Sequence, residues 1–391
     1  MSLRIEMALP SMPPAGMETV VARLTRALLA RGHAVGITCT EEVGALGESL
    51  RTEGVRVDLV PAPGLRTNLF PRALARAFRE RDPHVVHSHS GAWLKIARAA
   101  AMAGVPRVVH TVHGRHERES LLGRVLLRRA ARSTHAVVAV SRPLLVHYAA
   151  HGRVAHDRLC LLPNGIDTSR FRPGASGVLR RRFGLDDTRV IIGHVARFAP
   201  VKNQLMLIEA FARLHARRPE TFLALIGDGE LRADLVRRVS ELAIAPHVGF
   251  FGMADDLPDL YRDFDVFALS SFTEGTSMSI LEAMATGVAV VATAVGGNPD
   301  LLDHGNAGRL VPNDDAAAFA GALEVLAARP DERASLGAAA RDRVLAHYDH
   351  ERMVDAYEAI YRALPLPASP AGHDSYASDL LACAESQADT H

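Results

Sequence analysis

The stretch VFALSSFTEGTSMSILEAMATGVAVVA, residues 266–292, decides the fold of this chain. It opens with a short apolar run at residues 266–269 and turns at residues 274–275. It then continues into a helix-forming segment at residues 277–285 and ends in a second apolar run after Gly287. Two short apolar strands joined by a helix form a parallel pair, because the helix carries the chain back across one face of the sheet. The stretch therefore predicts a βαβ unit.

The same alternation of short apolar strands and amphipathic helices extends along most of the chain. It is interrupted at residues 163–165, Pro-Asn-Gly, and resumes after residue 185. We therefore predict an α/β protein with two Rossmann-like, doubly wound domains, residues 1–165 and 185–347, facing each other across a cleft. Residues 365–391 are rich in Pro, Ala, Ser and Asp without periodicity, and we expect a disordered tail. Outside residues 266–292, strands are expected at residues 3–9, 34–40, 85–87, 108–111, 136–140, 190–195, 222–226 and 248–251.

Charge is unevenly distributed. Residues 1–164 carry 23 Lys and Arg against 12 Asp and Glu, and residues 165–391 carry 22 against 32. Either the basic half meets an anionic partner, or the two halves attract each other. Lys95 and Lys202 are the two lysines among the 45 basic residues, so the chain uses arginine wherever positive charge alone suffices.

The cysteines and the hydropathy of the chain indicate the cellular compartment in which the protein works. Cys39, Cys160 and Cys383 are far apart in the sequence, which predicts reduced thiols instead of a disulfide framework or zinc cluster. No apolar run reaches the ~18 residues that a membrane helix needs, and MSLRIEMALP lacks the apolar core of a signal peptide. We expect a cytoplasmic protein.

The turn and helix at residues 273–285 carry the strongest chemical signal. Gly275 closes a strand-to-helix turn, and Thr276 and Ser277 then offer backbone N–H groups at a helix start, which attracts phosphate and sugar hydroxyls. Glu274 at the mouth and Glu282 within the helix can each accept hydrogen bonds from vicinal hydroxyls. The segment predicts a site for a phosphorylated sugar.

A second signal is GHVARFAPVKN, residues 193–203, at the end of the first strand of the second domain. Arg197 and Lys202 project from this loop, and fixed cations there suit a diphosphate whose charge grows as a glycosidic bond breaks. A lysine in a chain of arginines indicates that a compact ammonium is needed at this point. The cations of Arg197 and Lys202 and the carboxylates of Glu274 and Glu282 thus point to the same class of substrate, a sugar linked to a diphosphate.

The first domain offers weaker candidates. Gly16 at a helix start lets backbone approach a phosphate closely, and His113 follows a buried strand, where it can polarise a sugar hydroxyl. His87 and His89 form an H-x-H pair, but no carboxylate cluster accompanies them, so we expect no metal. The acidic pair in residues 263–265 leads into an apolar strand and is expected to be structural. No G-x-G-x-x-G with a downstream acid is present, which argues against a nicotinamide dinucleotide.

Over residues 3–364 the chain resembles the retaining glycosyltransferases of the GT-B fold, the glycosyl transferases group 1 and family 4-like proteins. The most specific mark is EGTSMSILEAMATGVAVVAT followed by GGNPD. The supporting marks are AGME, DPHVVHSHS, HTVHG, VAVS, LPNGIDTSRF, GHVARFAPVKN, LIGDGE and VGFFG. The resemblance implies transfer of a sugar from a nucleoside diphosphate, most readily UDP, to a hydroxyl acceptor, with retention and without a metal or other cofactor.

The resemblance also implies roles for single residues. Contacts to the transferred sugar and the reacting bond would come from the catalytic candidates His113 and Glu274. The donor would be bound by Gly16, Arg197, Lys202, Gly275, Thr276, Ser277, Met278 and Glu282, with Phe251 and Gly252 beside the base. A helix at residues 348–364 would cross back to the first domain.

Three positions depart from the family pattern. Ala15 stands where a second glycine is common, Asp300 replaces the usual glutamate, and Thr276 with Ser277 replaces an apolar residue and proline. The detail of the phosphate loop and the choice of sugar are therefore open.

Other functions fit the same two-domain plan. A UDP-sugar 2-epimerase would need no acceptor, a metal hydrolase would use His87 and His89, and a sugar-nucleotide sensor would do no chemistry. The acceptor class stays open among cell-surface glycans, glycolipids and small molecules, as does the oligomeric state. No nucleic-acid partner is expected. The basic stretch at residues 115–132 is either an ordinary docking helix or an anionic-membrane contact, with Leu121, Leu122, Leu126 and Leu127 inward.

Overall fold

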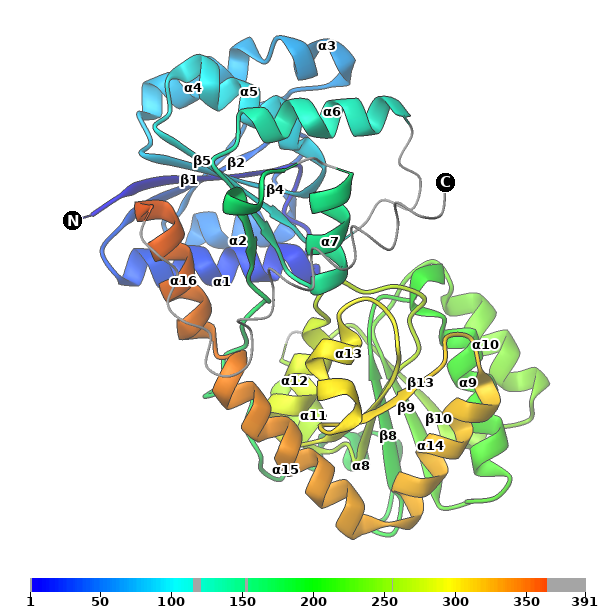
Figure 1. The fold of residues 1–391 in the computed structure, drawn as a ribbon. Helices are drawn as coiled ribbons and strands as arrows, with labels where there is room; N and C mark the ends of the chain where they lie inside the picture. Colours follow the sequence, from blue (N-terminus) through cyan, green and yellow to red (C-terminus); the bar gives the residue numbers. More distant parts are fainter. Residues whose placement is uncertain (1, 115–120, 152–153, 255, 364–391) are drawn as a thin grey trace. The chain divides into compact units, whose positions relative to one another are not determined.

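The computed structural model describes residues 2–114, 121–151, 154–254 and 256–363 (Figure 1). The described residues divide into two compact units: unit 1 comprises those up to Asn164 and those from Glu351 onward, and unit 2 comprises those from Gly165 to His350. The segment 165–185, in which the alternation of strands and helices is interrupted and which we interpret from the sequence as a linker, belongs to unit 2. The tail predicted at residues 365–391 lies outside the described residues.

Unit 1 is built on a seven-stranded sheet in which every strand pair is parallel, in the order β3-β2-β1-β4-β5-β6-β7. Its strands are β1 Arg4–Leu9, β2 Ala34–Cys39, β3 Arg56–Leu59, β4 Val85–His89, β5 Arg107–Val112, β6 Ala136–Ala139 and β7 Leu159–Leu161. Its helices are α1 Gly16–Ala30, α2 Gly44–Thr52, α3 Gly64–Leu69, α4 Arg72–Arg81, α5 Trp93–Ala103, α6 Leu121–Arg132, α7 Arg142–Ala150 and α16 His350–Arg362.

Both faces of this sheet are covered because alternate strand residues point to opposite sides. Ala8 and Val86 pack with α4, α5 and α6 in one core cluster. Met7 and Leu9 alternate with Ala8 along β1, so they point to the opposite face, and both are fully buried. Figure 1 shows α1 and α2 on the side of the sheet away from α4, α5 and α6. This two-sided burial explains why the central strands read as nearly continuous apolar runs.

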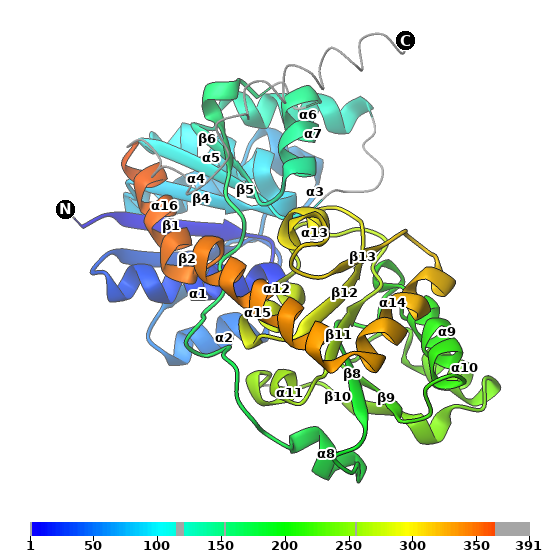
Figure 2. The same cartoon turned by 60° about the horizontal axis from the view of Figure 1, so that its bottom comes forward.

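Helix α16 is tied into unit 1 by polar contacts. Arg31 at the end of α1 forms ion pairs of 2.5–2.7 Å with three acidic residues of α16, Glu351, Asp355 and Glu358. The buried hydroxyl of Tyr357 lies 3.0 Å from Thr111 Oγ1. Helix α16 thus belongs to the first unit, and Figure 2 shows it beside β1 and α1.

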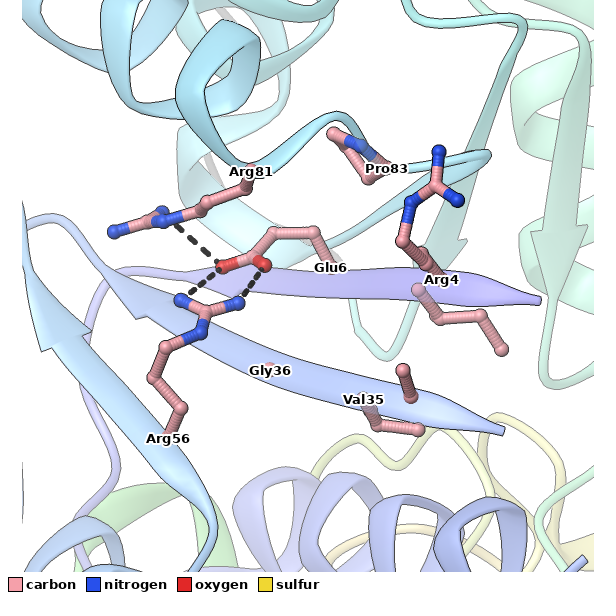
Figure 3. A pocket seen from close by; sticks show the side chains of 9 residues that line it. Arg4, Glu6, Val35, Gly36, Arg56, Arg81 and Pro83 are labelled. Atoms are coloured by element: carbon pink, nitrogen blue, oxygen red, sulfur yellow. Dashed lines mark hydrogen bonds and ion pairs between the residues drawn. The ribbon is translucent and has the colours of Figure 1, made fainter. Parts of the chain in front are cut away.

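Unit 1 also holds a buried ion-pair network beside a pocket near the amino ends of β1 and β2 (Figure 3). The Glu6 carboxylate is 1% exposed and accepts hydrogen bonds from Arg56 at 2.5 Å, Arg81 at 3.2 Å and Thr38 Oγ1 at 2.5 Å. The Arg56 guanidinium lies against Gly36, and a side chain at residue 36 would block it, because a Cβ there would stand 1.9 Å from Arg56 Nη2. Partners on every side make burial of this carboxylate tolerable.

Unit 2 contains a six-stranded parallel sheet in the order β10-β9-β8-β11-β12-β13. Its strands are β8 Val190–Val195, β9 Thr221–Ile226, β10 Val248–Gly252, β11 Val266–Leu269, β12 Ala289–Thr293 and β13 Arg309–Val311. Its helices are α8 Val178–Phe183, α9 Gln204–His215, α10 Arg232–Glu241, α11 Pro258–Arg262, α12 Met278–Thr286, α13 Asn298–Leu301, α14 Ala316–Ala328 and α15 Pro330–His347. Helices α9, α10 and α14 pack on one face, and α8, α11, α12, α13 and α15 on the other.

The βαβ unit predicted at residues 266–292 is confirmed. Strands β11 and β12 pair in parallel, with Val266 opposite Ala289, and α12 connects them. Helix α12 is buried along most of its length, including Ile280 and Met284, because it packs between the sheet and α15. Its start therefore lies at the carboxyl end of β11, where parallel sheets bind ligands.

Candidate active site

The loop after β8 is held in place by the loop after β9. The N–H of Ala196 donates to the Ile226 carbonyl at 3.1 Å, and that of Phe198 donates to the Asp228 carbonyl at 2.9 Å. A Cβ on Gly227 would stand 2.0 Å from the Ala196 carbonyl oxygen, so the two loops touch backbone to backbone. This contact fixes the segment that carries Arg197.

Lys202 is positioned by the end of β11. Ser270 Oγ donates to the Lys202 carbonyl at 2.9 Å, and the N–H of Phe272 donates to the Val201 carbonyl at 2.9 Å. The lysine backbone is thus anchored to the strand that precedes Glu274, which brings together side chains 72 positions apart in the sequence.

The structure joins two of the predicted residues directly. Lys202 Nζ donates to Glu274 Oε1 at 2.7 Å, and Ser271 Oγ donates to the same oxygen at 2.6 Å. The side chains of Lys202 and Glu274 are 24% and 9% exposed, so the ion pair is mostly shielded from water. An ammonium has three N–H groups, so Lys202 can hold Glu274 and still donate to a ligand. Sequence reasoning missed Ser271, because no motif marks a serine three residues before a glutamate.

The loop after β12 contacts the backbone of Glu274 and Gly275. The N–H of Gly297 donates to the Gly275 carbonyl at 3.1 Å. Gly296 has φ +53°, and a Cβ there would stand 1.8 Å from the Glu274 carbonyl oxygen. A glycine is therefore required at residue 296 for this close approach.

Helix α12 begins with Met278 directly after this turn. Ser277 is its N-cap, and its hydroxyl accepts a hydrogen bond from the N–H of Ile280 at 3.4 Å. Thr276 and Ser277 are buried. The capping serine satisfies one helix-start donor, which leaves the neighbouring amides of the first turn as candidates for ligand contacts.

Glu282 lies further along α12 and is 7% exposed. Its Oε2 accepts a hydrogen bond at 2.9 Å from the hydroxyl of Tyr261, a buried residue of α11. Sequence analysis missed this tyrosine, because α11 is five residues long and too short to show a periodic pattern. The contact fixes the carboxylate of Glu282 in one orientation.

Arg197 and the expected base region also belong to unit 2. Arg197 is exposed, and among the described residues its guanidinium makes no ion pair; its carbonyl accepts from Gln204 Nε2 at 2.9 Å. Phe251 and Gly252 end β10, where the Gly252 carbonyl accepts from the N–H of Gly227 at 2.8 Å. The base region therefore touches the same glycine that supports the Arg197 loop.

The unit 1 candidates lie at two other strand ends. Gly16 is the first residue of α1 and is exposed, with no atom within 4 Å of where a Cβ would be. His113 follows β5, and burial lowers its pKa to about 4, so the ring is neutral at pH 7. Its Nε2 lies 3.1 Å from His89 Nδ1.

The histidines and aspartates that the sequence analysis set aside as metal ligands have hydrogen-bond partners within the protein. His87 Nδ1 and Nε2 each lie 2.7 Å from a hydroxyl, that of Tyr361 and that of Thr111. Asp263 accepts from the N–H of Leu179 at 2.6 Å at the start of α8, and Asp265 accepts from the N–H of Ile191 at 2.8 Å. The structural interpretation of the two aspartates is confirmed. No group of three or more possible metal ligands occurs within the described ranges.

Helix α6 covers the last part of the basic stretch. Leu126 and Leu127 pack against the core of unit 1, which favours the docking helix over membrane insertion of these two leucines. Residues 115–120, and the side chains of Leu121 and Leu122, lie outside the described part of the chain. Among the helices described, none has the length and apolarity to cross a bilayer.

Comparison with known proteins identifies the family. The family described as Glycosyl transferases group 1 matches residues 177–343, and the one described as Glycosyltransferase Family 4 matches residues 14–170. The GDP-mannose-dependent alpha-(1-6)-phosphatidylinositol monomannoside mannosyltransferase of Mycobacterium tuberculosis is 31% identical over 339 residues, 81% of this chain and 86% of that protein. The chain belongs to the glycosyl transferases group 1 family.

Other relatives of this glycosyltransferase support the assignment. The D-inositol 3-phosphate glycosyltransferase of Stackebrandtia nassauensis is 32% identical over 378 residues, 84% of this chain and 82% of that protein. Anabaena HepE in complex with UDP superimposes with a TM-score of 0.81 at 20% identity, covering 93% of this chain and 100% of that one. A glycosyltransferase from Rickettsia africae gives 0.82 at 19% identity, covering 93% and 98%. These structures show the shared GT-B fold.

Proposed function

We propose that this glycosyltransferase moves a sugar, with retention and without a metal, from a nucleoside diphosphate to a hydroxyl acceptor. The observation that carries the proposal is the Lys202–Glu274 ion pair of 2.7 Å at the carboxyl end of the unit 2 sheet, beside the start of α12. It sets a cation suited to phosphate next to a carboxylate suited to sugar hydroxyls. In this role Lys202 and Arg197 neutralise the diphosphate, as a divalent cation does in other transferases.

In the proposed reaction the acceptor oxygen bonds to the anomeric carbon as the bond from that carbon to the diphosphate oxygen breaks. The acceptor proton passes to the departing phosphate, and the nucleoside diphosphate leaves. Glu274 holds hydroxyls of the transferred sugar, and Glu282, oriented by Tyr261, holds the ribose hydroxyls. Fixed positive charge at the diphosphate stabilises the leaving group most in the transition state.

For the donor we propose GDP-mannose ahead of the UDP-sugar that the family resemblance first suggested. A relative from Mycolicibacterium smegmatis, 38% identical over 256 residues, 62% of this chain and 66% of that protein, is described as GDP-mannose-dependent, as is the Mycobacterium tuberculosis protein. The alternative is supported by an Escherichia coli relative, 29% identical over 263 residues, whose name specifies UDP-Gal.

For the acceptor we propose an inositol-containing glycolipid, because relatives are named for phosphatidylinositol monomannoside and inositol 3-phosphate. One surface patch of unit 1 supports the proposal that the acceptor lies in a lipid surface. Phe70 is 63% exposed, and Leu69 beside it is joined to Arg98, whose Nε donates to the Leu69 carbonyl at 3.0 Å. An exposed aromatic ring next in the chain to a residue held by an arginine suits an anionic interface.

The experiment pairs each donor with each acceptor. The purified protein is incubated with GDP-mannose or UDP-galactose, and with phosphatidylinositol vesicles, inositol 3-phosphate or no acceptor, with and without EDTA. Transfer in EDTA, and a product with the donor's anomeric configuration by NMR, are expected. An inverted product or loss of transfer in EDTA would overturn the retaining or metal-free part of the proposal, and epimer formation without acceptor would indicate the 2-epimerase instead.

A further inference from the structure

The loop after β8 carries both cations of the proposed diphosphate site, and its two ends are anchored to different strands. The Arg197 end is held by the loop after β9, to which the N–H groups of Ala196 and Phe198 donate. The Lys202 end is held by the end of β11, where Ser270 Oγ donates to the Lys202 carbonyl at 2.9 Å. A hydrogen bond across the loop would couple the two cations to each other directly.

The side chain of Gln204 makes such a hydrogen bond. Gln204 is the first residue of α9, directly after the loop, and it is fully buried. Its Nε2 donates to the Arg197 carbonyl at 2.9 Å, seven positions back along the chain. The orientation of the amide is fixed, because a carbonyl oxygen can only accept and the amide offers N–H groups on its nitrogen alone. One buried amide thus joins the residue that carries the guanidinium to the helix that starts two residues after the lysine.

Stability alone does not explain an amide at this position. The Oε1 atom of Gln204 is buried and has no hydrogen-bond partner among the described residues. A buried acceptor without a donor destabilises a fold, whereas an apolar side chain of similar shape does not. The Arg197 guanidinium is exposed and forms no ion pair within the described ranges, so the backbone of Arg197 sets the region that this guanidinium can reach. The hydrogen bond to the Arg197 carbonyl is therefore what the amide supplies and an apolar residue could not.

We propose that Gln204 is a positioning residue, which holds the Arg197 backbone so that the guanidinium and the Lys202 ammonium bind the two phosphates of one diphosphate together. The inference rests on the proposed function, because that function supplies the diphosphate. Gln204 is buried, so it acts through Arg197 and does not contact the donor. A nucleoside monophosphate has one phosphate, which can bind either cation whatever their spacing. Gln204 therefore favours a diphosphate over a monophosphate.

Isothermal titration calorimetry with GDP, GMP, UDP and UMP tests this role without a sugar or an acceptor. Gln204→Met keeps the length of the side chain and removes the donor together with the unpartnered acceptor, so its melting temperature should stay within about 4 °C of wild type. Binding of the preferred diphosphate should weaken about tenfold, and binding of the matching monophosphate less than about twofold. If Gln204→Met does not fold, Gln204→Asn, which shortens the amide by one methylene, provides the same comparison.

A double variant shows whether the glutamine acts through the arginine. In the Arg197→Ala background, Gln204→Met should weaken diphosphate binding less than about twofold, because no guanidinium is left to position. Asn298→Leu is the matched control. Asn298 is also fully buried, its Nδ2 donates to the Thr293 carbonyl at 3.0 Å, and its Oδ1 has no partner in the described part of the chain. Asn298→Leu should leave the ratio of diphosphate to monophosphate affinity unchanged, because Thr293 carries no cation.

Several outcomes would overturn the positioning role while the wild type still binds a nucleoside diphosphate. They are unaltered diphosphate binding by Gln204→Met, equal weakening of diphosphate and monophosphate, and a tenfold loss that persists in the Arg197→Ala background. An equally large change of the affinity ratio in Asn298→Leu would also overturn it, since any buried amide would then have the same effect. A wild type that binds neither GDP nor UDP overturns the proposed function itself, and this inference with it.

Discussion

Replacing Lys202 by methionine tests the centre of the proposed site. Methionine keeps most of the apolar stem and removes the ammonium that lies 2.7 Å from Glu274 Oε1. At charge separations near 4 Å and an effective dielectric of about 20 the attraction is about 4 kcal/mol, and desolvation of the two groups offsets part of it. Because Ser271 still bonds Glu274, we expect the variant to lose about 1–2 kcal/mol of folding free energy.

The effect on ligand binding should be larger than the effect on folding. A charge-assisted hydrogen bond to a diphosphate contributes about 2–3 kcal/mol, so Lys202→Met should weaken binding of GDP or UDP, whichever the wild type prefers, by about 30-fold to 150-fold. Glu274→Gln should leave binding of the nucleoside diphosphate near the wild-type value, because the diphosphate meets the lysine and not the carboxylate. It should lower sugar transfer strongly.

Isothermal titration calorimetry with the nucleoside diphosphate measures these affinities for wild type, both single variants and the double variant. Lys95→Met is a matched control, since the Lys95 ammonium donates to the Ala62 carbonyl at 2.8 Å in unit 1 and belongs to no ion pair among the described residues. It should bind as wild type does. Binding by Lys202→Met within about twofold of wild type would refute the assignment of this lysine to the diphosphate.

Three further predictions concern one glycine, one tyrosine and two buried histidines. Gly296→Ala should cost about 2 kcal/mol more folding free energy than Gly184→Ala in chemical denaturation, because both glycines have positive φ, but only a Cβ on Gly296 meets a backbone oxygen, at 1.8 Å; equal losses would contradict the close approach. Tyr261→Phe removes the hydroxyl that donates to Glu282, and calorimetry should show GDP bound about tenfold more weakly and 2′-deoxy-GDP nearly unchanged; equal weakening of both ligands would argue against a ribose role. Acid should destabilise the protein, because burial lowers the pKa of His87 to about 3 and that of His194 to about 4. Below pH ~6.5 the unfolded chain therefore binds protons that the folded chain does not, and each fully buried ring should lower the free energy of unfolding by about 2 kcal/mol at pH 5. A melting temperature that is flat from pH 7.5 to 5 would contradict the neutral buried rings.

Strands at the centre of each sheet could be predicted from the sequence, and three strands at the sheet edges could not. Central strands such as β8 and β11 are buried on both faces, so they read as apolar runs whatever their neighbours. The edge strands β3, β7 and β13 were missed, because they are three or four residues long and only partly buried. Their pairing partners, distant in sequence, decide that they are strands at all.

The sequence by itself determined the α/β class, the alternation of strands and helices, and the candidates Arg197, Lys202, Glu274 and Glu282, because these depend on local periodicity and on residue types at strand ends. Tertiary structure alone decided which side chains meet. The 2.7 Å contact of Lys202 with Glu274, the Tyr261 hydroxyl on Glu282 and the His89–His113 hydrogen bond each join different elements of the fold. No local pattern encodes such distances, since they arise only when strand order and register bring separate loops to the same edge of a sheet.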